Sequence, residues 1–148
     1  MITDTLTALF LRELDTLQKE LSAYTDEKNL WKTDRNISNS VGNLALHLVG
    51  NLNHFIGFQL GHTGYIRQRD KEFSDKDVAL KTLLKQIEDT KSMIPPVLSK
   101  LTSEDLSKEV KVSDNHPIMT LELFLNYILV HLSYHLGQIN YHRRLLDA

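Results

Sequence analysis

The chain has 148 residues, a hydrophobic content of 41% and a formal net charge of −2. This length and apolar content predict one domain with one core, spanning residues 1–148. The 17 basic and 19 acidic side chains are spread along the chain without the basic stripe that nucleic acid requires, so we expect no nucleic-acid partner.

Two further features predict a cytoplasmic location. The chain contains no cysteine, so it has neither a disulfide framework nor an internal thiol nucleophile, which fits a reducing compartment. Its first residues lack the basic and then apolar layout of a signal peptide, and it has no apolar run long enough to span a membrane. We therefore expect no membrane partner.

The first predicted helix follows from apolar residues spaced by three and four over residues 6–24. Thr3 or Asp4 can cap its N-terminus, and the polar residues that follow end it. The connection over residues 25–40 is mostly too polar to be core. We expect Trp31 within this connection to cover one end of the core.

A second helix is predicted to begin after the N-cap residue Ser40 and to end at the glycines of residues 61–64. His47 stands on its apolar arc, and His54 lies two turns further along nearly the same line. The charged segment 65–73 comes next. It is either a solvated connection or, with residues 25–40, the rim of a pocket.

The third helix has a less regular apolar period. The capping-box layout of residues 74–77 predicts its start. Pro95 and Pro96 predict a break or sharp kink, because a proline in a helix interior costs about 3 kcal/mol. Residues 102–119 form a polar connection in which residues 110–112 can make a short extended piece.

The last helix opens at the cap residue Thr120. Its predicted inner stripe includes His135, with His131 and His142 beside the stripe. Four long amphipathic helices without an alternating strand pattern predict an all-α fold, an antiparallel four-helix bundle with long first and third connections.

His131 and His135 are four residues apart, a spacing that places both imidazoles on one face of a helix, where they can bind one metal ion. Two imidazoles rarely hold a divalent ion alone, so a third ligand must come from elsewhere. His47 lies on the apolar arc of another helix, at a depth that a facing helix can match.

The alternative is that these three are core histidines that hydrogen-bond to tyrosine, asparagine or backbone groups. Nearby polar side chains on the same helices favour a wet pocket instead. These side chains are Asn51, Asn126, Tyr127, Tyr134 and Gln138.

The sequence gives weaker evidence that the remaining histidines take part in metal binding. His62 and His116 lie in predicted loops, where we expect them to face solvent. His54 and His142 are either boundary residues or groups that support the metal ligands. His54 cannot join His47 on one ion, because two helical turns separate them by about 10 Å.

Two elements of the chain resemble a known family. In residues 40–48, an apolar helical run is followed by His47, and residues 131–138 read His-x-x-x-His-x-Gly-Gln. Together they resemble the DinB/YfiT-like superfamily, and the likeness extends over almost the whole chain. The Gly-Asn pair at residues 50–51 and the segment 69–73 resemble an uncharacterised branch of that superfamily.

This resemblance implies an up-down-down-up four-helix bundle, often a homodimer, with a divalent metal bound by three histidines. Carried over to this chain, the ligands are His47, His131 and His135. Characterised relatives include thiol S-transferases that use bacillithiol, mycothiol or glutathione, and a mycothiol-dependent isomerase. The implied partners are therefore a small-molecule thiol and an electrophile.

Three neutral imidazoles leave the charge of a divalent ion uncompensated, which favours an anionic fourth ligand. In one hypothesis this ligand is the sulfur of an external thiol, which the metal activates for attack on an electrophile. In a second, the metal binds water and the protein is a hydrolase. A third hypothesis is a non-catalytic dimeric bundle with a vestigial or structural metal.

The ligand helix reads His-Leu-Ser-Tyr-His and lacks the glutamate of the His-Glu-x-x-His metalloproteases, which disfavours peptide hydrolysis. Nickel, zinc, iron and manganese all accept three imidazoles, so the sequence does not select the metal. The candidates for orienting a substrate are Asn51, Arg67, Tyr127 and Tyr134.

Overall fold

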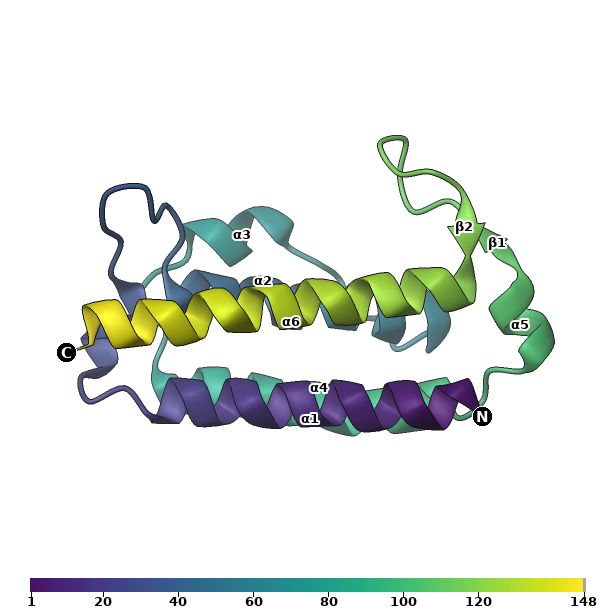
Figure 1. The fold of residues 1–148 in the computed structure, drawn as a ribbon, viewed down its shortest axis with the longest axis horizontal. Coiled ribbons are helices and arrows are strands. Elements are labelled where there is room, and N and C mark those ends of the chain that lie inside the picture. The colour runs from purple at the N-terminus through teal and green to yellow at the C-terminus, as the bar shows by residue number, and fades with distance from the viewer. Residues whose placement is uncertain (148) are drawn as a thin grey trace.

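The computed structural model describes residues 1–147, and its long helices form a four-helix bundle (Figure 1). The long helices are α1 (Ile2–Ser22), α2 (Val41–Leu52), α4 (Leu80–Leu98) and α6 (Leu121–Leu146). Helices α1 and α6 run in one direction and α2 and α4 in the other, which is the predicted up-down-down-up order (Figure 1). Helices α1 and α2 each pack against both α4 and α6.

Shorter elements connect these helices. The 3₁₀-helix η1 (Glu27–Trp31) precedes α2, and the π-helix η2 (Asn53–Leu60) continues it. The short helices are α3 (Arg69–Ser74) and α5 (Ser103–Ser107). The two strands are β1 (Glu109–Val110) and β2 (Met119–Thr120). The two strands pair antiparallel, with Val110 opposite Met119. The predicted extended piece is thus confirmed at Val110, whereas Val112 lies outside the strand.

The core forms where the apolar stripes of the four long helices meet. The predicted stripe of α1 is buried along its length, since Leu6, Phe10 and Leu14 are each at most 1% exposed. On α6 the stripe is rotated slightly from the prediction: Leu136 is buried, and His135 lies half-buried at the margin of the core. No helix within residues 1–147 combines the length and apolarity that crossing a membrane would require.

Helix α4 differs from the prediction at its C-terminal end. It runs without a break through Pro95 and Pro96 to Leu98, so the predicted interruption is wrong. The two prolines remove two helical amide donors, but they lie in the last turn, so only a few residues of helix follow the point at which a kink would arise. Ser99 N still donates to Pro95 O at 3.0 Å and closes that turn.

The start of α4 also corrects the prediction. The helix begins at Leu80, after Asp77 takes a left-handed φ of 56°, and residues 74–77 do not cap it. Residues 69–74 form helix α3 instead of an irregular connection. Asn43 Nδ2 holds α3 on α2 by donating to the carbonyl oxygens of Glu72 (2.9 Å) and Asp75 (2.8 Å).

The N-terminal ends of α1 and α2 differ in how well they were predicted. Helix α1 begins at Ile2, and Thr3 is buried inside the helix instead of capping it. The Ser40 cap of α2 is confirmed, because its hydroxyl accepts from Asn43 N at 3.2 Å. Trp31 packs against the core as predicted, over Gly42, where a Cβ would come within 2.5 Å of its ring.

Candidate metal centre

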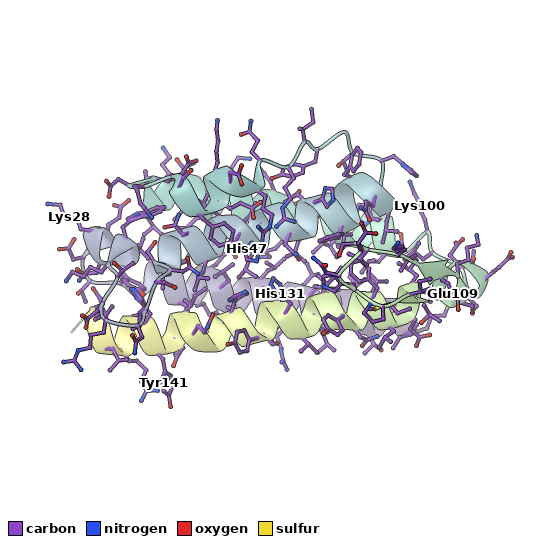
Figure 2. All side chains as sticks on the ribbon, turned by 90° about the horizontal axis from the view of Figure 1, so that it is seen from above. Lys28, His47, Lys100, Glu109, His131 and Tyr141 are labelled. Atoms are coloured by element: carbon purple, nitrogen blue, oxygen red, sulfur yellow. The ribbon has the colours of Figure 1, made fainter. Side chains whose placement is uncertain are left out.

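Three histidines from two helices converge inside the bundle. His131 Nε2 lies 3.2 Å from His47 Nε2 and 3.2 Å from His135 Nε2. One ligand atom from each ring falls within 4.8 Å of the other two. Figure 2 shows His47 and His131 in the space between α2 and α6, the helices that carry them.

Hydrogen bonds at the far side of two rings set where their protons lie. His47 Nδ1 is 3.0 Å from Glu72 Oε1, and His135 Nδ1 is 2.7 Å from Gln138 Oε1. An ionised carboxylate and an amide oxygen only accept, so each Nδ1 donates its proton. When these rings are neutral, their Nε2 atoms keep the lone pairs, which point into the cluster.

The environment of the cluster favours neutral imidazoles. Burial, together with positive charge at His135, His47 and Arg67, lowers the pKa of His131 to about 4. Burial also lowers the pKa of His135, against the hydrogen bond to Gln138, which raises it. Because only the unprotonated ring binds a metal, these shifts keep the nitrogen atoms available at neutral pH.

The spacing of the three nitrogen atoms fits one divalent ion. Two imidazole ligands on a tetrahedral zinc ion lie about 3.3 Å apart, which follows from metal–nitrogen bonds of roughly 2.0–2.1 Å. The separations of His131 Nε2 from His47 Nε2 and from His135 Nε2, both 3.2 Å, match that value. In residues 1–147 no fourth histidine, aspartate or glutamate joins this group, so a bound ion would keep an open position.

Glu72 was not predicted as part of the site. Its buried carboxylate accepts from Arg67 Nε at 2.8 Å and Arg67 Nη2 at 2.9 Å, as well as from His47. Burial raises the pKa of Glu72, but the hydrogen bonds from His47 and Arg67 outweigh it and lower that pKa overall. The result is an ionised carboxylate that orients one metal ligand.

Gly50 is the residue in the sequence that could have indicated the close approach of a side chain such as Glu72. A glycine inside a helix costs up to about 1 kcal/mol relative to alanine and often marks a close approach. A Cβ at Gly50 would lie 2.0 Å from Glu72 Oε2, so only glycine leaves room for the carboxylate. Glu72 lies on α3, outside the two helices that carry the ligands.

A cavity of about 300 Å³ adjoins the cluster and is lined by two of its three histidines, His47 and His131. Phe55, Phe124 and Ile128 give it an apolar wall, and Arg69 and His116 add basic groups. No carboxylate lines it among the residues that the structure describes.

The four predicted substrate-orienting residues are placed differently. Asn51, Arg67 and Tyr127 line the cavity, and the buried Asn51 Oδ1 has no hydrogen-bond partner within residues 1–147. Arg67 is held by Glu72 and therefore has less freedom to bind a substrate. Tyr134 lies outside the cavity, and its exposed ring packs edge-on against His135 with centroids 5.5 Å apart.

The other histidines stay out of the cluster. His62 and His116 are exposed, as predicted, although His116 also borders the cavity. His54 is half-buried and stacks on a neighbouring phenylalanine ring in η2. His142 is a structural residue: it accepts from Tyr24 Oη at 2.7 Å through Nδ1 and donates to a backbone oxygen at 2.8 Å through Nε2.

A larger cavity of about 810 Å³ lies where η2, α4 and β1 meet. Met93, Val97 and Leu121 contribute to its apolar lining. It contains none of the three clustered histidines, so the smaller cavity is the better candidate for a reaction site.

Comparison with known proteins identifies the family. A family model described as a protein of unknown function, DUF1572, matches residues 4–148. The chain belongs to the DUF1572 family. No curated protein matches this member of the family.

Two solved structures share the fold. One is YfiT from Bacillus subtilis, which is described as a probable metal-dependent hydrolase with an unusual four-helix bundle topology. It superposes with a TM-score of 0.76 and 21% identity, and the match covers 96% of this chain and 86% of YfiT. A DinB-like protein from Bacillus cereus superposes with a TM-score of 0.69 and 20% identity over 92% of this chain and 89% of its own. The DinB/YfiT-like fold is therefore confirmed.

Proposed function

We propose that the chain is a divalent-metal-dependent enzyme that transfers a low-molecular-weight thiol of the bacillithiol type to an electrophile. The observation that best supports this proposal is the convergence of three Nε2 atoms, from His47, His131 and His135. They lie beside a cavity whose described lining contains no carboxylate. Such a donor set is neutral, so it favours an anion at the open position of the site.

A bound divalent ion would supply a Lewis acid that lowers the pKa of a thiol or a water molecule. The protein's own residues prepare the site for it. Glu72 and Gln138 accept hydrogen bonds from the Nδ1 atoms of His47 and His135, which directs the Nε2 atoms of these rings inward. Arg67 balances the charge of Glu72, so that carboxylate adds no net negative charge beside the cavity.

The cavity lining suits a thiol that carries carboxylates together with an apolar electrophile. Arg69 and His116 can attract an anionic group at the rim. Phe55 and Phe124, which meet edge-on with centroids 5.2 Å apart, offer an apolar surface. Asn51 Oδ1 can accept a hydrogen bond from an N–H or O–H group of the substrate. The chain has no cysteine, so the thiol must come from outside.

A metal-dependent hydrolase is the second candidate, and the description of YfiT supports it. Hydrolysis commonly employs a general base beside the attacked substrate. Glu72 is in hydrogen-bond contact with the cluster but is already engaged by Arg67 and His47. Thiol transfer does not need that base, since the metal itself lowers the pKa of the thiol.

The first test is metal content. Protein purified without a histidine tag should retain a divalent metal that His135→Ala loses. His62→Asn is the matched control, because His62 is an exposed loop histidine and asparagine tolerates its left-handed φ of 51°. Equal retention by the parent and His135→Ala would refute the assigned ligands and support a non-catalytic bundle.

The second test is the reaction. Consumption of monochlorobimane should require both the metal and a thiol, with bacillithiol, mycothiol and glutathione compared at equal concentration. Metal-dependent cleavage of ester or amide substrates without any thiol would instead establish the hydrolase. Consumption that ignores both metal and thiol would exclude the transferase.

A further inference from the structure

Two polar atoms beside the histidine cluster are buried without a hydrogen-bond partner. They are His131 Nδ1 and Asn51 Oδ1, and no other buried side-chain atom within residues 1–147 lacks a partner in this way. Both residues line the cavity of about 300 Å³. An unpaired buried polar group destabilises a fold, so native structures provide a partner for nearly all of them. Two unpaired atoms in one cavity wall therefore point to a bond that forms there.

The two residues face each other across the helix pair that carries the metal ligands. Asn51 lies one turn after His47 on α2, so both side chains leave the same face of that helix. His47 Nε2 is 3.2 Å from His131 Nε2, and α2 runs antiparallel to α6 (Figure 1). The turn of α2 that carries Asn51 therefore faces the turn of α6 before His131. The His131 ring covers that turn, because helical side chains tilt toward the N-terminus of their helix.

The other two rings of the cluster each have an acceptor for an Nδ1 proton. Glu72 Oε1 accepts from His47 Nδ1 at 3.0 Å. Gln138 Oε1 accepts from His135 Nδ1 at 2.7 Å. A neutral histidine that binds a metal through Nε2 carries its proton on Nδ1 and almost always donates it to a nearby acceptor. His131 is thus the one ring of the three without such an acceptor in the described structure.

Asn51 Oδ1 is an acceptor that lacks a donor, so it is the partner that His131 Nδ1 needs. Both atoms are buried, and solvent therefore does not supply the missing bond. We propose that Asn51 is the positioning residue of His131 and that His131 Nδ1 donates to Asn51 Oδ1 when a metal binds the three Nε2 atoms. The amide oxygen has two lone pairs, so it can accept from a substrate group as well. The inference rests on the proposed metal site and is independent of thiol transfer.

Metal binding also changes which nitrogen of His131 carries the proton. His131 Nε2 lies 3.2 Å from the Nε2 atoms of both His47 and His135, whose own protons are on Nδ1. Two lone pairs thus face His131 Nε2, so in protein stripped of metal the neutral His131 ring carries its proton on that atom. A metal at the three Nε2 atoms excludes this proton. The neutral ring then carries its proton on Nδ1, where Asn51 Oδ1 accepts it.

Zinc affinity of the full chain tests the role of Asn51. Protein stripped of metal is titrated with Zn²⁺ in competition with a chromophoric chelator. Asn51→Leu keeps the size of the side chain but removes the acceptor, so its affinity should fall about 10- to 100-fold. Asn51→Asp keeps an oxygen acceptor and should bind Zn²⁺ at least as tightly as the parent. Asn126→Leu is the matched control and should bind like the parent, because Asn126 lies outside the cavity and donates to Glu122 O of its own helix.

The outcomes separate this inference from the proposed function. Parental affinity in Asn51→Leu would overturn the inference and leave the metal site standing. An equal loss in Asn51→Leu and Asn51→Asp would also overturn it, because the site would then depend on the shape of asparagine and not on its acceptor. A parent that binds no Zn²⁺ would refute the metal site itself, and both proposals with it.

Nitrogen-15 NMR of the parent tests the position of the proton and needs no variant that alters Asn51. The imidazole signals of His131, assigned by their loss in His131→Gln, should show the proton on Nε2 without metal and on Nδ1 with Zn²⁺. His47 and His135 should carry it on Nδ1 in both states. A Zn²⁺-bound His131 with its proton on Nε2 would overturn the proposal.

Exchange of that proton with water identifies its acceptor. In the Zn²⁺-bound protein, the Nδ1 proton of His131 should exchange at least tenfold more slowly in the parent and in Asn51→Asp than in Asn51→Leu. A purely structural role of Asn51 would not produce this difference. Equal exchange in the parent and Asn51→Leu would show that Asn51 is not the acceptor.

Discussion

His47 Nδ1 donates a 3.0 Å hydrogen bond to Glu72 Oε1, and this bond joins α2 to α3 across 25 residues of sequence. Both side chains are buried, and Arg67 completes the arrangement from the other side of the carboxylate. The bond fixes the ring orientation and tautomer of His47. Glu72 is therefore a positioning residue for the candidate metal centre.

Replacing Glu72 should weaken metal binding without removing a ligand. We expect Glu72→Ala to lower the affinity for Zn²⁺ or Ni²⁺ by about 10- to 100-fold, the usual effect of losing a carboxylate that supports a ligating histidine. Competition with a chromophoric chelator measures this affinity. Glu88→Ala should leave it unchanged, because Glu88 is an exposed carboxylate that bonds Gln18 and Lys91 instead. Unaltered affinity in Glu72→Ala would show that the contact has no bearing on the metal.

Gly50 should tolerate a side chain only when Glu72 is shortened. The Cβ of Gly50→Ala would lie 2.0 Å from Glu72 Oε2, so we expect the variant to lose about 1–3 kcal/mol of unfolding free energy through overpacking. In a Glu72→Ala background the same substitution should cost little. Urea unfolding of the two single variants and the double variant measures the coupling. Additive effects would contradict the close contact.

Tyr24 should contribute to stability and not to metal binding. Its hydroxyl donates to the buried His142 Nδ1 at 2.7 Å, so Tyr24→Phe leaves that nitrogen unpaired at a cost of about 1–3 kcal/mol. Urea unfolding measures the loss, and metal titration of the folded variant should match the parent. Tyr65→Phe is a suitable control, since no side-chain hydrogen bond of its hydroxyl is present in residues 1–147. A weakened metal affinity in Tyr24→Phe would assign His142 a role at the site.

The hydrogen-bonded carboxylate of Asp147 should make the unfolding free energy of the protein depend on pH. Hydrogen bonds from the Asn29 side chain and the Thr25 amide lower its pKa to about 2, below the value of about 3.9 for an unfolded aspartate. A depressed pKa contributes stability that is present above about pH 4 and is lost as the pH falls towards 2. Asp147→Asn should therefore be less stable than the parent at pH 7, and the difference should shrink between pH 4 and pH 2.

Urea unfolding at several pH values measures that difference. Asp34→Asn is the control, because Asp34 is exposed and its side chain makes no hydrogen bond or ion pair within residues 1–147. Its stability relative to the parent should vary little over the same range. A constant gap between the parent and Asp147→Asn from pH 7 to pH 2 would exclude the carboxylate as the source.

Local sequence determined that four long helices form, and it brought two of the three clustered histidines together. Apolar spacing in a helix reports a buried face directly, which is why the stripe from Leu6 to Leu21 was predictable. The four-residue spacing of His131 and His135 likewise places both rings together whatever the rest of the chain does. The cap at Ser40 is equally local, since the hydroxyl bonds an amide three residues away.

Tertiary structure alone decided what surrounds those histidines. The approach of His47 to His131 depends on how α2 and α6 pack, although its apolar arc had suggested it. The place of Glu72 depends on α3, which Asn43, on another helix, holds by donating to the carbonyl oxygens of Glu72 and Asp75. Spacing within one helix says nothing about contacts between helices, because these arise from the folding of distant segments onto one core. The sequence by itself therefore determined the ligand pair, and the packing of α2 against α6 and of α3 against α2 decided the rest of the centre.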